Sequence, residues 1–416
     1  MSEAVVTGLG VVSAIGQGKQ AFSAALLAGR SAFGLLQRPG RQLPGDTACF
    51  AGAEIASLQL PHALLQALPH APSVSLRTAS LSARAALSAL HEAWHEARLD
   101  QVAPERIGLI VGGSNFQQRE LMRTHATHAQ QPWFVAPSYG QVFMDSDLCG
   151  LCTALFPVRG FAYTLGAASA SGQMAILQAC HAVSSGQVDV CIAIGALMDL
   201  SYWELQALSS MGAMGSSRYL HAPATACRPF DTDRDGFIYG EACGAVVIER
   251  TGLAGNADRS GVQPYARCLG GAVVMDGNRH PDPSLAGETA VIGQALRQCG
   301  LRASDIDYVN PHGSGSRIGD ETELQALRAN ELQHAWINTT KSVTGHGLSA
   351  AGAVEVVATL LQMRAGQLHP SCNLEQPMEP DWRFVRGAAQ DCALRNALTL
   401  SIGFGGINTA MCWQQP

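Results

Sequence analysis

Short apolar runs that end at or beside glycine constrain the fold of this chain more than any other feature of its sequence. They are rich in β-branched residues and too short for helices that cross a domain. Runs of this kind are typical of strands buried on both faces of a sheet. The runs are Val5–Val12, Arg106–Gly113, Val188–Gly195, Gly244–Glu249, Ala266–Val274, Ile306–Asn310 and Ala397–Gly403.

Helical patterns separate these runs, with apolar residues three and four positions apart. Alternating strands and helices predict an α/β fold with mostly buried sheets. The turn-rich segment Thr251–Gly261 predicts an internal boundary, so we expect an N-terminal half over 1–255 and a C-terminal half over 256–416. The expected helices are Thr78–Ala97, Gly172–Ser184, Ser284–Gly300, Glu321–Asn330 and Gly352–Ala365.

Composition excludes several classes of protein. Hydrophobic residues make up 47% and charged residues 14% of the 416 residues, which indicates a large core. A net charge of −6 and the lack of a basic block argue against a nucleic-acid partner. The sequence has no signal peptide and no apolar run of roughly 18 residues, so we expect a cytoplasmic protein without a membrane span.

The 12 cysteines are scattered through apolar segments, as buried thiols are in intracellular proteins. Cys149 and Cys152 have the spacing of a redox or metal motif, but no second pair or nearby histidine pair completes a zinc site. We therefore expect no metal site.

Three glycine-rich loops carry candidate chemistry. Ser169 lies in a run of small residues directly before a predicted helix, whose N-terminus favours developing negative charge. His312 and His346 lie in two further loops, each after a strand, and could donate hydrogen bonds to one oxyanion. Each signal alone has an ordinary explanation, because serines often cap helices and single histidines are often structural.

Taken together, the motifs resemble those of the β-ketoacyl synthase family over nearly the whole chain. The opening VVTGLGVVSAIGQG resembles the family's first strand and loop, and the remaining motifs follow in the family's order. They are Arg228–Asp231 (RPFD), Arg234–Phe237 (RDGF), Gly240–Gly244 (GEACG), Asn310–Gly319, Thr340–His346 (TKSVTGH) and Ser401–Asn408 (SIGFGGIN).

The resemblance implies a thiolase-like fold, with layers in the order αβαβα and two related halves. It also implies a homodimer without a bound cofactor, acting on thioesters carried by the phosphopantetheine arm of an acyl carrier protein. His312 and His346 would be the catalytic histidines. Lys341 would position and polarise its surroundings, with Glu323 as its electrostatic partner.

The same resemblance implies residues that contact the substrate arm. Phe404 would gate the site, and Ser314 and Ser316 keep hydroxyl groups where relatives contact pantetheine. The segment 276–281 occupies a loop that often contacts the thioester arm in relatives, although a solvated turn explains its sequence equally well.

One departure decides the expected function, because Ser169 stands where the family has its cysteine nucleophile. A cysteine, with a pKa of about 8.5, supplies some thiolate, whereas a serine needs a dedicated base. No G-x-S-x-G motif surrounds Ser169. Chain condensation should therefore be lost, but decarboxylation of a malonyl thioester needs only the two histidine donors.

This pattern is similar to that of free-standing, serine-substituted ketosynthase-like decarboxylases of polyketide β-branching cassettes. These enzymes convert malonyl carrier protein to acetyl carrier protein, which an HMG-synthase-like enzyme then uses. The alternatives are a noncatalytic partner subunit of an active ketosynthase, acyl transfer through Ser169, and slow condensation on serine.

Overall fold

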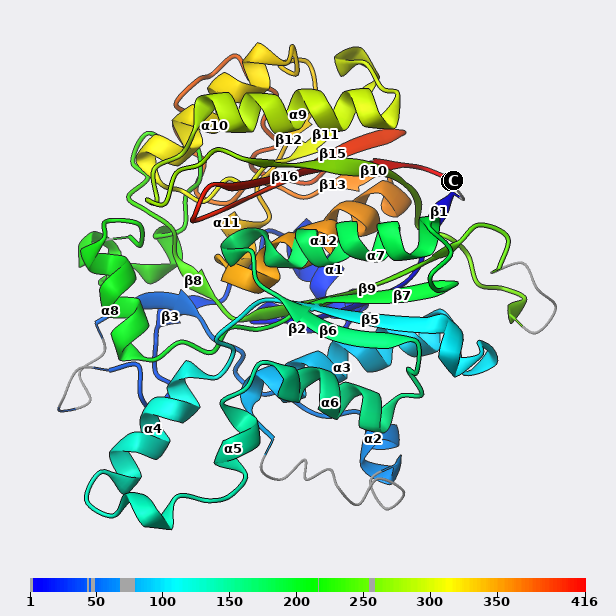
Figure 1. Cartoon of the computed structure of the whole chain (residues 1–416). Coiled ribbons are helices and arrows are strands. Elements are labelled where there is room, and N and C mark those ends of the chain that lie inside the picture. Colours follow the sequence, from blue (N-terminus) through cyan, green and yellow to red (C-terminus); the bar gives the residue numbers. More distant parts are fainter. Residues whose placement is uncertain (1–2, 43–44, 46–48, 68–78, 216, 254–258) are drawn as a thin grey trace.

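The computed structural model describes residues 3–42, 45, 49–67, 79–215, 217–253 and 259–416. Figure 1 shows five layers, in which two outer groups of helices and one central group enclose two halves of a sheet. This is the layered α/β architecture predicted from the alternating strands and helices. The predicted boundary at 255/256 lies outside the described residues.

The two halves belong to one 11-stranded sheet that is joined at a single place. The joint is a short antiparallel pairing, in which Ala4–Val6 lie opposite Ala266–Cys268. One half holds β12 (Trp336–Ile337), β11 (Tyr308–Asn310), β15 (Asn396–Gly403), β16 (Ile407–Gln414) and β10 (Ala266–Met275). The other holds β1 (Ala4–Ser13) with β2 (Gly16–Gln17), β9 (Ala242–Arg250), β7 (Val190–Gly195), β5 (Ile107–Gly112) and β6 (Phe161–Leu165).

Helices cover both outer faces and fill the space between the halves (Figure 1). The central layer contains α7 (Ser171–Ser184) and α12 (Ala351–Ala365), which are buried over most of their surface. Such helices are apolar all round because both sides face a core. The outer helices are α3 (Leu81–Glu96) and α6 (Ser146–Leu155) on one side, and α9 (Leu285–Cys299) and α10 (Arg317–Ala329) on the other.

Smaller elements surround this frame. A three-stranded sheet holds β3 (Phe33–Leu35), β4 (Ala51–Ala53) and β8 (Tyr239–Gly240), and β13 (Gln367–Leu368) pairs with β14 (Gln390–Asp391). The other helices are α1 (Lys19–Leu27), α2 (His62–Ala67), α4 (Gln118–His128), α5 (Tyr139–Val142), α8 (Tyr202–Ser210) and α11 (Lys341–Thr344). None of the helices in the described ranges has the length and hydrophobicity needed to span a bilayer.

The predicted strands and helices are all present, but several observed elements were not predicted, among them the buried strand β16 and the exposed strand β6. Every predicted strand coincides with an observed strand, and every predicted helix overlaps an observed helix. Strand β6 was not predicted, because its residues are partly exposed and lack a buried apolar pattern. Cys149 and Cys152 are buried in α6, as predicted, and no described group of three or more His, Cys, Asp or Glu could hold a metal ion.

The central helices touch backbone to backbone at their N-termini. A Cβ atom on Gly172 would lie 2.7 Å from the backbone nitrogen of Ala353, and one on Gly352 would lie 2.9 Å from the backbone nitrogen of Gln173. Only glycine permits this approach. The segments that precede the two helices therefore end at the same place in the molecule.

We predict that Gly352→Ala lowers the free energy of unfolding by about 1–3 kcal/mol, because the added methyl group overlaps fixed backbone atoms. Gly150→Ala is the matched control: Gly150 lies inside α6, and a Cβ there would meet no atom within 4 Å. The control should leave stability unchanged or raise it by up to about 1 kcal/mol. Thermal and urea unfolding would measure both, and equal stability of the two variants would contradict the prediction.

Candidate active site

Ser169 lies on a tight turn between β6 and α7. The turn is a 3₁₀ segment, Ala168–Ala170, and Ala168 takes a left-handed backbone conformation with φ of 46°. The Ser171 hydroxyl stabilises it by donating to the Ala168 carbonyl (2.7 Å) and accepting from the Ala167 N–H (2.8 Å). Neither serine caps α7, whose N-cap is Ala170, so capping does not explain either of them.

The hydroxyl of Ser169 has no hydrogen-bond partner among the described residues, although its carbonyl accepts from the Ser401 hydroxyl at 3.2 Å. The side chain is half-buried and faces a cavity. A serine nucleophile needs a base within hydrogen-bond reach. The geometry therefore gives Ser169 no activation as a nucleophile.

His312 and His346 face the same cavity as Ser169. Their ring centroids are 5.3 Å apart and the rings are almost perpendicular, at 78°. Nδ1 of His346 accepts from the Leu348 N–H at 3.1 Å, and Nδ1 of His312 faces the Lys341 ammonium at 3.4 Å. Both Nδ1 atoms act as acceptors, so the ring proton of each histidine lies on Nε2.

Burial lowers the pKa of His312 and of His346 well below the usual value for histidine. The Lys341 ammonium lowers both pKa values further, and His346 adds to the effect on His312. Both imidazoles are therefore neutral at neutral pH. They can donate two N–H hydrogen bonds to one oxygen without carrying a charge.

Lys341 is fully buried and forms a direct ion pair with Glu355 of α12. Its ammonium group also donates to the His312 carbonyl. Burial raises the pKa of Glu355 to about 7, and the ammonium partly offsets that rise. Sequence reasoning missed Glu355, although it is the only charged residue among the first 13 of the apolar helix α12.

Glu323 binds the backbone of the loop that carries His312. Its carboxylate accepts from the backbone N–H groups of His312 (2.5 Å) and Gly313 (2.7 Å), and so fixes the histidine loop. Burial raises its pKa to about 8. The carboxylate in direct contact with Lys341 belongs to Glu355, whereas Glu323 interacts with the Lys341 ammonium only as a nearby charge.

The cavity has a volume of about 870 Å³ and brings together all the expected substrate-contacting side chains. Ser314 accepts from the Ser316 N–H (3.3 Å), and Ser316 accepts from the Gly319 N–H (2.9 Å) at the start of α10. Both hydroxyl groups keep a proton to donate to a ligand. Phe404 is 38% exposed and lies in the turn between β15 and β16.

The segment 276–281 borders the cavity and is tied to that turn. The Asp276 N–H donates to the Gly406 carbonyl (3.0 Å), and the Asp276 carboxylate accepts from Asn408 Nδ2 (3.1 Å). Asp276, His280 and Pro281 line the cavity. Of the two interpretations of this segment, the structure favours contact with the site.

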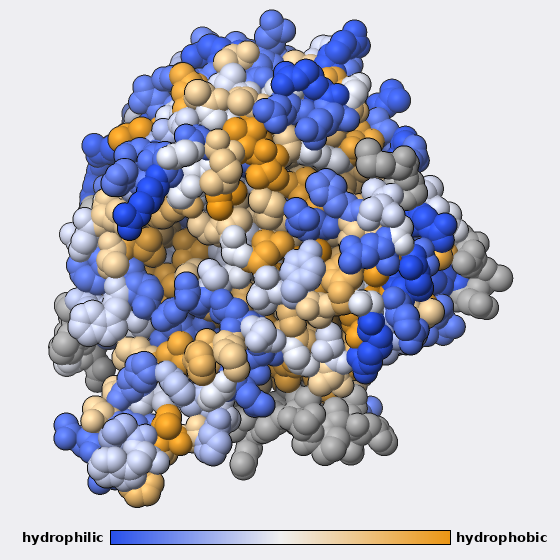
Figure 2. Space-filling model, in the orientation of Figure 1, coloured by the Kyte–Doolittle hydropathy of each residue, from blue (hydrophilic) through white to orange (hydrophobic). Residues whose placement is uncertain are grey.

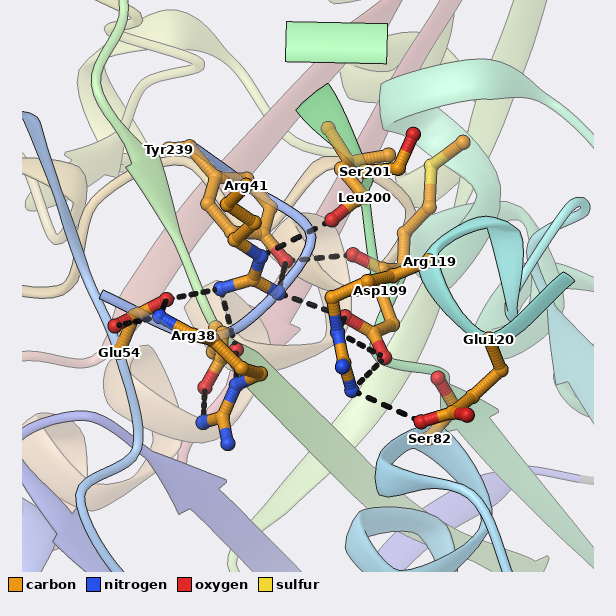
Figure 3. A network of polar contacts seen from close by, with 12 residues as sticks. Arg38, Arg41, Glu54, Ser82, Arg119, Glu120, Asp199, Leu200, Ser201 and Tyr239 are labelled. Carbon is orange, nitrogen blue, oxygen red and sulfur yellow. Dashed lines mark hydrogen bonds and ion pairs between the residues drawn. The ribbon is translucent and has the colours of Figure 1, made fainter. Parts of the chain in front are cut away.

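A buried charge network supports the opposite wall of the cavity (Figure 3). Arg41 is fully buried and forms ion pairs of 2.7 Å with Asp199, Glu54 and Glu241. Arg119 of α4 binds the other side of the Asp199 carboxylate. Because Asp199 lies between Met198 and Leu200, which line the cavity, the network holds this wall in place.

We predict that NMR titration of the histidines finds His312 neutral at pH 6 and that Lys341→Met raises its pKa, because the nearby ammonium is removed. Lys19→Met is the control, since Lys19 pairs with Glu96 and is not among the residues that line the cavity. Signals would be assigned with His312→Gln and His346→Gln. An unchanged His312 pKa in Lys341→Met would contradict the electrostatic coupling.

Comparison with known proteins agrees with the motifs and the geometry. The family models "Beta-ketoacyl synthase, N-terminal domain" and "Beta-ketoacyl synthase, C-terminal domain" match residues 1–254 and 265–375. A polyketide biosynthesis malonyl-ACP decarboxylase, PksF of Bacillus subtilis, is 55% identical over 414 residues, which cover 100% of this chain and 97% of that protein. A putative polyketide β-ketoacyl synthase of Streptomyces halstedii is 30% identical over 99% of this chain and 98% of its own length.

A solved structure of a β-ketoacyl synthase from Burkholderia phymatum superposes with a TM-score of 0.86 at 25% identity, covering 100% of both chains. The thiolase-like fold that the motifs implied is therefore confirmed. The chain belongs to the β-ketoacyl synthase family.

Proposed function

We propose that this chain decarboxylates malonyl-acyl carrier protein to acetyl-acyl carrier protein without a cysteine nucleophile. The observation that carries the proposal is a pair of neutral histidine donors facing one cavity, beside a serine that has no base. A full-length relative at 55% identity is a malonyl-ACP decarboxylase.

The chemistry follows from the two donors. The bond between the malonyl carboxylate and the α-carbon breaks, CO₂ leaves, and the electron pair moves into an enolate. The enolate oxygen accepts hydrogen bonds from Nε2 of His312 and His346. Each donor in such an oxyanion hole contributes about 3–4 kcal/mol to stabilisation of the transition state.

The cavity walls assist the loss of the carboxylate. Apolar side chains line much of the cavity near the histidines, including Met198, Leu200, Leu348 and Ile402. A carboxylate is poorly solvated in such surroundings, whereas neutral CO₂ is not penalised. The cavity therefore raises the free energy of the ground state more than that of the transition state, in which the charge moves to the histidine-bound oxygen.

The alternatives lack an observation in their favour. Acyl transfer or condensation through Ser169 would need a base at its hydroxyl, and no described residue provides one. A noncatalytic subunit would have no use for two neutral histidines supported by Lys341 and Glu355. Decarboxylation uses all four of these residues.

The acyl carrier protein would be the partner, and its phosphopantetheine arm would carry the substrate into the cavity. Ser314, Ser316 and Phe404 are placed to contact that arm. The protein itself would hold no cofactor. We further propose that the acetyl product serves polyketide β-branching through an HMG-synthase-like enzyme, and a cytoplasmic location stays a prediction.

We also propose a homodimer that pairs through β6, the last strand of the sheet. Ala162 and Tyr163 of β6 are both exposed, although their side chains point to opposite faces of the strand. An unpaired strand edge is a template for pairing with a second chain. In Figure 2, orange hydrophobic residues gather near the middle of the face on which β6 lies in Figure 1.

We predict that His312→Ala and His346→Ala each lower the decarboxylation rate by about 10²–10³-fold, whereas Ser169→Ala lowers it less than about tenfold. Intact-protein mass spectrometry of malonyl-loaded carrier protein would follow the loss of CO₂. His62→Ala, an exposed residue of α2, is the control. Equal losses from Ser169→Ala and the histidine variants would indicate covalent catalysis and refute the mechanism.

For the dimer, we expect sedimentation to give about twice the chain mass of 43.7 kDa at micromolar concentration. Ala162→Pro should shift the protein toward monomer, because proline removes a backbone donor and disturbs the strand edge. A monomeric wild-type protein would contradict this arrangement.

A further inference from the structure

Glu288 is a buried acid in the cavity that the chemistry described above does not use. It lies in the first turn of α9, is 3% exposed, and lines the same cavity as Ser169, His312 and His346. None of the described residues forms a hydrogen bond with its carboxyl group. A buried carboxyl without a partner is costly, so its presence at a reaction cavity calls for a function.

Six other acidic side chains line the cavity, and the three that raise the pKa of Glu288 are held by backbone or side-chain donors. Glu323 binds two N–H groups of the histidine loop, and Asp320 accepts from the N–H groups of Phe230 (2.7 Å) and Gly315 (3.0 Å). Asp276 accepts from the Asn278 N–H (2.9 Å). Glu288 alone of the four has its carboxyl group available to a ligand.

Close packing places Glu288 beside the glycine-rich turn of the site. Ser284 caps α9 by accepting from the Gly287 N–H at 3.1 Å. A Cβ atom on Gly287 would lie 2.9 Å from both Asn408 Nδ2 and Asp276 Cβ. The first turn of α9 therefore packs against the segment that carries Phe404. Glu288 directly follows Gly287 in this turn.

Burial and the acids around Glu288 favour its protonated form. Burial raises its pKa well above the usual value, and the neighbouring carboxyl groups of Glu323, Asp276 and Asp320 raise it further. These groups come from α10 and from the end of β10, which pack against α9. Strand β16 also packs against α9 and contains no charged residue. Burial and the neighbouring acids thus both favour the neutral, protonated form of Glu288.

Decarboxylation without condensation needs such an acid. Loss of CO₂ leaves an enolate whose α-carbon must gain a proton before acetyl thioester can leave. The Nε2 protons of His312 and His346 are committed to the enolate oxygen, and the Lys341 ammonium is bound to Glu355 and to the His312 carbonyl. A separate donor on the cavity wall meets this requirement.

We propose that Glu288 is the general acid that protonates the α-carbon of the enolate, directly or through one water molecule; this inference rests on the proposed decarboxylation. The O–H bond of Glu288 breaks, its proton forms the third C–H bond of the acetyl group, and the enolate electron pair closes that bond. The thioester carbonyl is restored and Glu288 becomes a carboxylate. Solvent at the cavity mouth returns the proton, so no other reactant is consumed.

The test is single-turnover decarboxylation of malonyl-loaded carrier protein, followed by mass spectrometry between pH 6 and 9, with wild type and Glu288→Gln. We expect the variant to form acetyl carrier protein about 10²-fold more slowly. The wild-type rate should fall as rising pH deprotonates Glu288, and the variant should lose this part of the pH dependence while keeping any part that comes from Glu323. Glutamine has the shape of the neutral acid, so unfolding temperatures should agree.

Two further variants separate an acid from a structural role. Glu288→Asp keeps an acid and should retain the alkaline fall in rate. Glu321→Gln makes the same substitution on the exposed face of α10 and should match wild type at every pH. A wild-type rate and pH profile in Glu288→Gln would overturn the role of Glu288 alone. An inactive wild-type enzyme would overturn the proposed decarboxylation and this inference with it.

Discussion

The contact between the N-termini of α7 and α12 is the constraint on which the active site depends. Ser169 precedes one helix and His346 precedes the other, so their separation is set by how closely the two helix ends approach. Glycine at 172 and at 352 permits backbone contact. Gly112 and Gly195 bring strand backbones equally close to the same helix ends, since a Cβ on either would overlap Ser171 or Ala353. Backbone packing thus sets the positions of the segments that carry Ser169 and His346.

Electrostatics at the site follow from burying a lysine beside two histidines. The Lys341 ammonium is compensated by Glu355, which allows a cation to remain in the interior. Burial lowers the pKa of both imidazoles, the Lys341 ammonium lowers both pKa values further, and its position opposite Nδ1 orients His312. A neutral imidazole donates one hydrogen bond without holding a negatively charged product as strongly as an imidazolium would. This suits an enolate that must be released as a neutral thioester.

Replacement of the cysteine nucleophile by serine changes the fate of the enolate but leaves the two histidine donors in place. In a condensing enzyme the enolate carbon attacks an acyl group held on cysteine, whereas here the Ser169 hydroxyl has no hydrogen-bonded base among the described residues. The same enolate can then only be protonated. A cavity with two neutral donors and an unpartnered protonated acid, Glu288, contains the groups that this shorter reaction needs.

The sequence by itself determined the order of most buried strands and helices, because apolar periodicity and glycine punctuation are local properties of the chain; the buried strand β16 was not predicted. It also determined the family and the identity of Ser169, His312, Lys341 and His346, because each stands in a short motif. Exposed elements such as β6 escaped prediction, since an edge strand lacks a buried pattern.

Only the tertiary structure decided which carboxylate binds the Lys341 ammonium and which binds the backbone of the histidine loop. Glu323 stands close to the histidine motif in sequence, yet it binds backbone N–H groups, while Glu355, 14 residues beyond Lys341, forms the ion pair. Glu288 belongs to no motif, and its raised pKa arises from burial and from three acids contributed by other segments. Contacts and pKa shifts of this kind depend on distances between segments far apart in the chain, which local sequence patterns do not encode.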